Sequence, residues 1–301
     1  MKPLLQLRLS EVIIVLMFVL FSCTGERGST GVETAFCLYP RLDTKASADP
    51  DPVLISDFNL LIYNCFGLLE EAVYVSERDI SEVAEYSTTL LGGSTYTVLV
   101  GANFGYPLGR MSLSDAMAME YYMAYPDEYS HGIPMAAVVK GVLAGDRVNV
   151  RLERLMAAVD ISLDRSGLDP GVEISPVEVS VGNCPSAVKP FDPGKAVHFF
   201  HTGFSRSGRE LDALENGGAL RMYVLENLAG DSPSSYIEIK SAYHSSSSHS
   251  KPGEYLIYRF YLKGESSYDI RRNTLYRVTV CPVGDGLSCD DGWRVDAGAV
   301  D

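Results

Sequence analysis

The chain has 301 residues, about twice the length of a typical domain of about 150 residues, so we expect two globular domains. Hydrophobic residues make up 46% of the chain and charged residues 21%, which is typical of folded proteins and excludes a largely disordered one. The 25 Lys and Arg residues against 39 Asp and Glu give a net charge of -14, which disfavours nucleic acid as a partner.

The N-terminus has the pattern of an export signal. Lys2 and Arg8 precede an apolar run over 12–21, which is too short to cross a bilayer core of about 30 Å as a helix. We therefore predict a signal peptide over 1–22. The run ends in Leu20-Phe21-Ser22-Cys23, which resembles a bacterial lipobox with Cys23 as the residue to be lipidated, although Phe21 is bulkier than usual there. The alternative is an ordinary secretory peptide with an incidental cysteine.

Lipidation would decide where the mature chain resides. Each buried CH₂ of an acyl chain contributes about 0.8 kcal/mol, so diacylation of Cys23, palmitate included, would anchor the chain to a membrane. Thr24 follows Cys23 where an Asp would favour retention, so by resemblance to lipoprotein sorting we expect the outer membrane and the cell surface. Residues 23–34, rich in Gly, Ser and Thr, are predicted to form a flexible tether.

The remaining cysteines are odd in number, so at least one thiol should stay free. Cys281 and Cys289 flank the turn-rich segment 282–288, which is compatible with a hairpin and a disulfide; two unpaired cysteines are the alternative. No C-x-x-C pair occurs, which excludes a zinc ribbon and a thioredoxin-type motif. The five cysteines other than Cys23 are Cys37, Cys65, Cys184, Cys281 and Cys289.

An internal repeat is visible. Residues 55–65 align without gaps on residues 174–184, with four identical positions. In both copies the apolar residues follow the period of two expected of a half-buried strand. Residues 96–100 resemble residues 276–280, which we take as a second pair of equivalent strands. The apolar positions in the first alignment are Phe58, Leu60 and Ile62, and Val177, Val179 and Val181.

The apolar period changes phase near Arg154, from even positions over 148–152 to odd positions over 155–163. Within one strand this indicates a β-bulge, and between two strands it indicates a change of domain. Because residues 156–184 mirror residues 35–65, we predict an N-terminal domain over 35–153 and a C-terminal domain over 154–301.

Few segments have a helical pattern. The best candidate is 113–124, where Ser112 and Asp115 form a capping-box pattern and Pro126 ends the run. Its methionines, Met117, Met119 and Met123, are expected to fill core space rather than to line a partner groove.

Catalytic and metal-binding patterns are weak. Residues 203–208 are one residue too long for a G-x-S-x-G elbow and are predicted to form a turn. His198 and His201 would lie on opposite faces of a strand, and Glu70 and Glu71 would point apart. We therefore assign no catalytic residue, no metal site and no cofactor.

The order of several short motifs resembles the Bacteroidales fimbrial subunits, the fimbrillin and fimbrial-anchor lipoproteins of type V pili. The resemblance covers most of the mature chain, but each motif is short, and Leu225 departs from the proline usual before Glu226-Asn227. The motifs are residues 133–135, 152–159, 223–227 and 272–278.

The resemblance implies two tandem transthyretin-like Greek-key β-sandwich domains, with a short helix in the first, that assemble with other fimbrial subunits by donor-strand exchange. In that family the polymerising subunits lose their first strand by cleavage after a basic residue, whereas the lipidated anchor keeps it. Here Thr34–Tyr39 is the expected first strand and Arg41 the candidate processing site, with an uncut loop arginine as the favoured alternative. The tail after Trp293 is short for a donor strand.

Two functions stay open from the sequence. One is a structural fimbrial component, either the anchor or a minor accessory subunit. The other is a surface lipoprotein that binds a glycan or another host or bacterial surface ligand, which would need an exposed aromatic platform. The single tryptophan argues against such a platform, whereas the 18 tyrosines are compatible with one.

Overall fold

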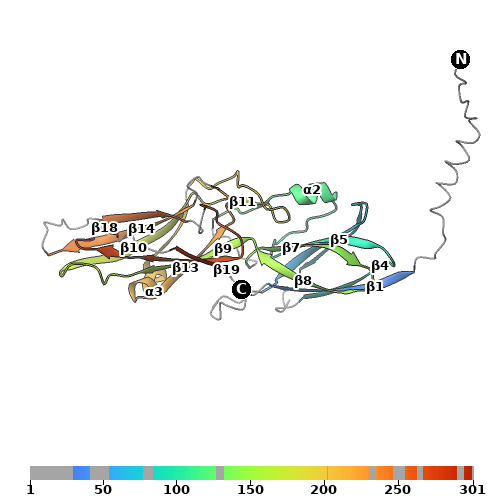
Figure 1. The fold of residues 1–301 in the computed structure, drawn as a ribbon, viewed down its shortest axis with the longest axis horizontal. Helices are drawn as coiled ribbons and strands as arrows, with labels where there is room; N and C mark the ends of the chain where they lie inside the picture. Colours follow the sequence, from blue (N-terminus) through green and yellow to red (C-terminus); the bar gives the residue numbers. More distant parts are fainter. Residues whose placement is uncertain are drawn as a thin grey trace, which may run out of the picture.

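The computed structural model has strands in two halves that lie end to end in an elongated molecule (Figure 1). Strands dominate and the helical segments are short, which confirms the predicted all-β class. Cys23, Arg41 and Trp293 lie outside the described residues. The structure describes residues 30–40, 54–76, 84–126, 132–201, 203–230, 235–246, 255–262, 267–289 and 295–299.

The sheet of the N-terminal half contains β1 (Gly31–Pro40), β2 (Asp57–Asn64), β3 (Leu69–Ser76), β4 (Ala84–Leu91), β5 (Thr95–Ala102), β7 (Met135–Leu143) and β8 (Arg147–Arg154). Its order is β3-β2-β5-β7-β8-β1-β4, and all neighbours are antiparallel except β1 and β8. β7 and β8 pair at only two positions, Met135 with Arg154 and Ala136 with Glu153. Beyond these the strands β4-β1-β8 and β3-β2-β5-β7 form two layers, with one apolar core between them.

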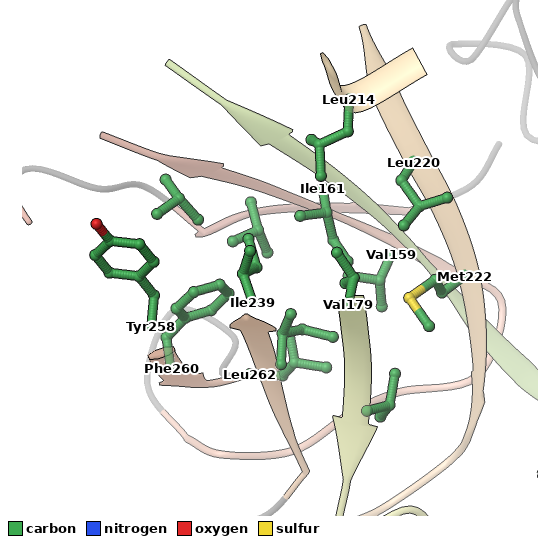
Figure 2. Packing of buried hydrophobic residues seen from close by; sticks show 14 of the residues in the cluster. Val159, Ile161, Val179, Leu214, Leu220, Met222, Ile239, Tyr258, Phe260 and Leu262 are labelled. Carbon is green, nitrogen blue, oxygen red and sulfur yellow. The ribbon is translucent and has the colours of Figure 1, made fainter. Parts of the chain in front are cut away.

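The C-terminal half contains β9 (Met156–Leu163), β10 (Val172–Gly182), β12 (Phe204–Ser207), β13 (Ala219–Leu225), β14 (Tyr236–Ser245), β15 (Tyr255–Tyr261), β16 (Thr274–Val280) and β19 (Val295–Ala299). They form two sheets, β12-β10-β14-β15 and β13-β9-β16-β19. Figure 2 shows side chains of both sheets meeting in the core, among them Val159, Val179 and Ile239.

The two halves repeat one strand order. β2 lies between β3 and β5 as β10 lies between β12 and β14, so the equivalence of residues 55–65 and 174–184 is confirmed. The predicted equivalence of residues 96–100 and 276–280 is wrong. The first segment lies in β5, the neighbour of β2. The second lies in β16, which pairs in parallel with β9 in the other sheet, as β8 pairs with β1. Alternating apolar residues recur in any half-buried strand, so this similarity does not indicate that the two strands have the same place in their sheets.

The inward faces of the repeat are buried with one exception. Val177 is 36% exposed because the pairing of β10 with β14 shifts between Pro176 and Glu178, and this bulge turns Val177 outward. Asn59 lies between these inward-facing positions, so the period of two places it on the opposite face of β2. It is also buried, since the segment after β5 covers that side of β2. Its Nδ2 donates to the Tyr106 carbonyl at 3.0 Å, and its Oδ1 accepts from the Leu108 amide at 2.8 Å.

The predicted helix is present but shorter than 113–124. It is α2 (Leu113–Ala118), with Ser112 as N-cap, whose Oγ accepts from the Asp115 amide at 3.1 Å. The chain turns extended at Met119 because the next residues form β6 (Tyr121–Tyr122), which pairs with β11 (Ala187–Val188) of the C-terminal half. Met123 is buried and Met117 and Met119 pack against the same core, as expected.

The phase break falls between strands. β8 ends at Arg154 and β9 begins at Met156, and the extra residue, Leu155, is fully buried. All partners of β8 precede this point and all partners of β9 follow it.

A third apolar cluster joins the two halves, and the sequence patterns did not predict it. It combines side chains of the first half, such as Leu61 and Leu99, with Leu155, Tyr223 and Leu275. Beside it, Arg272 Nη2 lies 2.7 Å from Glu226 Oε2, with side chains only 9% and 4% exposed. The two motifs 223–227 and 272–278, distant in sequence, therefore meet at the junction.

Candidate strand-exchange site

Strand β1 is held along both edges. It pairs antiparallel with β4 from Gly31 to Leu38, and in parallel with β8 from Ala35 to Pro40. The segment 35–38 thus has strand neighbours on both sides. Without β1, the facing edges of β4 and β8 would expose unpaired N–H and C=O groups, which another strand can bind.

The side chains of β1 complete the core of the N-terminal half. Phe36 and Leu38 are fully buried and belong to the same cluster as Val150 and Leu152 of β8. Burial of each contributes about 1.5–3 kcal/mol. Thr34 is also fully buried, and its Oγ1 accepts a hydrogen bond from the Gly145 amide at 2.9 Å. Removal of β1 would therefore leave an apolar groove.

Charged groups along the rim contribute little to holding β1. Arg147 Nη2 lies 2.6 Å from Glu85 Oε1, but both side chains are largely exposed, and such pairs contribute about 0–1 kcal/mol. Cys37 Sγ also donates to Glu85 Oε1, at 3.6 Å. Apolar burial and backbone pairing therefore dominate the attachment of this strand.

The bounds of β1 differ from the predicted 34–39. The strand begins at Gly31, because residues 31–33 already pair with β4, so the last part of the predicted tether belongs to the sheet. It ends at Pro40, directly before Arg41. A proline has no amide hydrogen to extend the ladder, which accounts for the end.

At the other end of the chain, β19 forms an edge strand. It pairs antiparallel with β16, from Val295 opposite Val278 to Ala299 opposite Thr274. Its pairing with β16 covers five residues, fewer than the pairing of β1 with β4, and it has a strand neighbour on one side only.

The catalytic candidates are placed in structural roles. The predicted turn over 203–208 is wrong, because residues 204–207 form β12, which pairs with β10. His198 is half exposed, with Nε2 3.5 Å from Glu120 Oε2. Glu70 accepts from the Asn64 amide group and Glu71 from the Tyr86 hydroxyl. Among the described residues, no group of three or more His, Cys, Asp or Glu could hold a metal ion.

Free thiols occur as expected for an odd cysteine count, at Cys37, Cys65 and Cys184. Burial raises the pKa of Cys184 to about 12, so this thiol stays protonated and unreactive at neutral pH. The predicted hairpin around 282–288 is present, since β17 (Pro282–Val283) pairs with β18 (Ser288–Cys289). The Cys281–Cys289 disulfide stays a prediction, because the Cys289 side chain lies outside the described part.

Within the described ranges, no helix has the length and apolar character needed to span a membrane.

Comparison by sequence finds no relatives: no protein-family model matches the chain, and neither does any curated protein. Comparison of the fold does. A Parabacteroides distasonis protein assigned to cell adhesion matches with a TM-score of 0.65 at 15% identity, over 89% of this chain and 96% of that one.

Two further solved structures come from Porphyromonas gingivalis. A fimbrilin matches with a TM-score of 0.61 at 13% identity, over 85% of this chain and 91% of that one. A tip fimbrial protein, truncated at its C-terminus, matches with a TM-score of 0.58 at 13% identity, over 89% and 98%. The fold of this chain is therefore that of Bacteroidales fimbrial and adhesion proteins.

Proposed function

We propose that this chain is a structural component of a cell-surface fimbria, either its lipid-anchored anchor or a minor accessory subunit, and not an enzyme. The observation that carries the proposal is β1, a terminal strand inserted between β4 and β8 with Phe36 and Leu38 fully buried. A strand in that position can be replaced by an extended strand of another subunit, which is donor-strand exchange. The likeness of the fold to a fimbrilin and a tip fimbrial protein supports the same class.

The proposal includes lipid attachment and domain organisation. Cys23 would be acylated and would hold the chain in the outer membrane, with residues 24–30 as the tether before β1. The domains would be two transthyretin-like β-sandwiches over 35–153 and 154–301. Their partners would be other fimbrial subunits, which would bind in place of β1 only in a subunit that has lost this strand.

If β1 is removed by cleavage at Arg41, the chain cannot keep its lipid tether, so one subunit cannot have both the tether and an open groove. Arg41 follows β1 directly, so cleavage there would separate the folded body from Cys23. An anchor must therefore keep β1 in place, remain monomeric in isolation and resist cleavage at Arg41. A subunit that polymerises would lose residues up to Arg41 and bind a donor strand.

Intact-mass analysis of protein from native membranes tests both points. For an anchor we expect a mass that begins at an acylated Cys23 and retains residues 24–41. A mass that begins after Arg41, together with oligomers, would contradict the anchor role but not the fimbrial class.

Replacing the lipidated residue tests the anchor separately. Cys23→Ser should release the protein from the membrane, because the remaining apolar run is too short to span it. Cys65→Ser, at an exposed thiol, is the matched control and should not change membrane retention. Full retention of Cys23→Ser would rule out lipid anchoring.

A further inference from the structure

The outward face of edge strand β15 carries a row of exposed side chains. Tyr258 and Phe260 point into the core (Figure 2), so the residues alternating with them face outward. Three of these are large and apolar: Tyr255 is 53% exposed, Ile257 59% and Tyr261 39%. The fourth, Arg259, lies between Ile257 and Tyr261.

The aromatic rings of this row are held in place by their neighbours. Tyr236 of β14 lies opposite Tyr261, with ring centroids 5.7 Å apart in an edge contact, and Tyr261 contacts Tyr268 in the same way at 6.3 Å. Tyr236 also packs against the backbone, because a Cβ atom at Gly182 would lie 2.1 Å from its ring. The Tyr255 ring has a different neighbour, since Lys240 Nζ lies 4.7 Å from its centroid. Tyr236 and Tyr261 therefore present a fixed surface, with little side-chain entropy left to lose on binding.

A charged pair with unused hydrogen-bonding capacity lies among the rings. Arg259 donates from Nε at 2.9 Å and from Nη2 at 2.7 Å to the same oxygen, Oε2 of Glu238. Within the described part of the chain, Nη1 of Arg259 and Oε1 of Glu238 have no hydrogen-bond partner. The guanidinium carbon lies 4.7 Å from the Tyr236 ring centroid, a cation–π contact that helps to hold the side chain in place.

We infer that this face of β14 and β15 binds a neutral oligosaccharide. Arg259 Nη1 can donate to one sugar hydroxyl group, and Glu238 Oε1 can accept from another. Tyrosine rings beside them offer apolar faces to the C–H groups of a sugar ring. From Tyr255 to Tyr261 the strand covers about 20 Å, which is long enough to contact several linked sugar rings.

The charged groups on this face and the net charge of the chain favour a neutral oligosaccharide over a protein or an anionic glycan. Glu238 and Lys240 of β14 and Arg259 of β15 place charged groups among the apolar residues of this face, whereas the core of a protein interface is depleted of charge. The net charge of -14 opposes an anionic glycan. The inference does not rest on the proposed fimbrial role, because it uses neither β1 nor Cys23.

Native gel electrophoresis through gels that contain dextran, mannan or galactomannan tests the inference with the full chain. We expect at least one of these neutral polysaccharides to retard the protein. Tyr255→Thr, Tyr261→Thr and Arg259→Met should each raise the apparent dissociation constant at least tenfold, and threonine keeps the preference for a strand. Tyr125→Thr is the matched control, since Tyr125 is 68% exposed but lies in the other half, and its binding should equal that of the wild type.

Three results would overturn the inference. One is no retardation by any of the three polysaccharides, and another is retardation that the β15 variants share with the control. The third is a concentration-dependent dimer in sedimentation equilibrium that Ile257→Lys abolishes, which would assign the face to a second copy of the chain. Binding to a neutral sugar should also persist at high salt, whereas a charged ligand would be released.

Discussion

Asn59 and Leu60 are neighbours on β2, and both are buried, although a strand alternates its faces. Leu60 points into the core of the N-terminal half, whereas Asn59 points to the segment after β5, which hydrogen-bonds its amide group. The period of two along the strand predicts the burial of Leu60 but not that of Asn59. A single polar residue among apolar ones has the same pattern whether it faces water or a loop that covers it.

The cost of losing apolar burial can be measured at equivalent positions of the repeat. Leu60→Ser and Val179→Ser should each lower the free energy of unfolding by about 2–5 kcal/mol, since each side chain is fully buried in its core. Urea titration monitored by circular dichroism measures this. Glu173→Ser, at an exposed position of β10, should change it by less than about 0.5 kcal/mol. Equal effects at all three positions would contradict the assigned faces.

The alternation of β2 suggests that a substitution at Asn59 is tolerated, whereas the hydrogen bonds of its side-chain amide predict a loss of stability. Asn59→Leu should destabilise the chain by about 1–3 kcal/mol, although it makes the strand more apolar, because the Leu108 amide and Tyr106 carbonyl lose their partner. The same urea titration decides the matter. A variant as stable as the wild type would indicate that water replaces the lost bonds.

At the scale of elements, the strands differ in how they are attached. β1 has neighbours on both edges, whereas β15 and β19 are edge strands. An inserted strand closes a core, and its loss opens a groove; an edge strand can change partners at lower cost. The proposed assembly uses the inserted strand β1, and the proposed sugar site lies on the outward face of the edge strand β15.

Weakening β1 should expose the groove. Leu38→Asp places a charge in the apolar core, so we expect β1 to detach and trypsin to cleave after Arg41. If the chain is an anchor, we expect Arg41 of the wild type to resist cleavage. Mass spectrometry of timed digests gives the cleavage site and rate. Glu33→Ser, at an exposed position of the same strand, should digest like the wild type. Slow cleavage of Leu38→Asp at Arg41 would show that β1 does not protect this site.

On the scale of the whole molecule, the junction makes the two halves one body. The paired strands β6 and β11, a shared apolar cluster and the buried pair Arg272–Glu226 all connect them. Arg272 also donates to the carbonyls of Lys189 and Pro190, and so holds the segment that follows β11. The molecule should therefore keep the elongated shape of Figure 1 in solution.

Breaking the buried pair should loosen the junction. Glu226→Gln and Arg272→Met should each cost about 3–5 kcal/mol, because one buried partner is left uncompensated, and the double variant should cost less than the sum. Urea titration gives the energies and small-angle X-ray scattering the shape. Arg147→Met, which breaks an exposed pair, is the control and should cost less than about 1 kcal/mol. Additive losses in the double variant would contradict a direct interaction.

The amino-acid sequence by itself determined the all-β class, the repeat at residues 55–65 and 174–184, the N-cap of α2 and the phase break near Arg154. These depend on local periodicity and capping, which each segment carries alone. Only the tertiary structure decided that β1 is inserted between two strands, that Asn59 is covered, that β16 is not the equivalent of β5, and that two motifs meet at Arg272 and Glu226. Such features depend on which distant segments pack together, and strands with the same alternation are interchangeable until their neighbours are known.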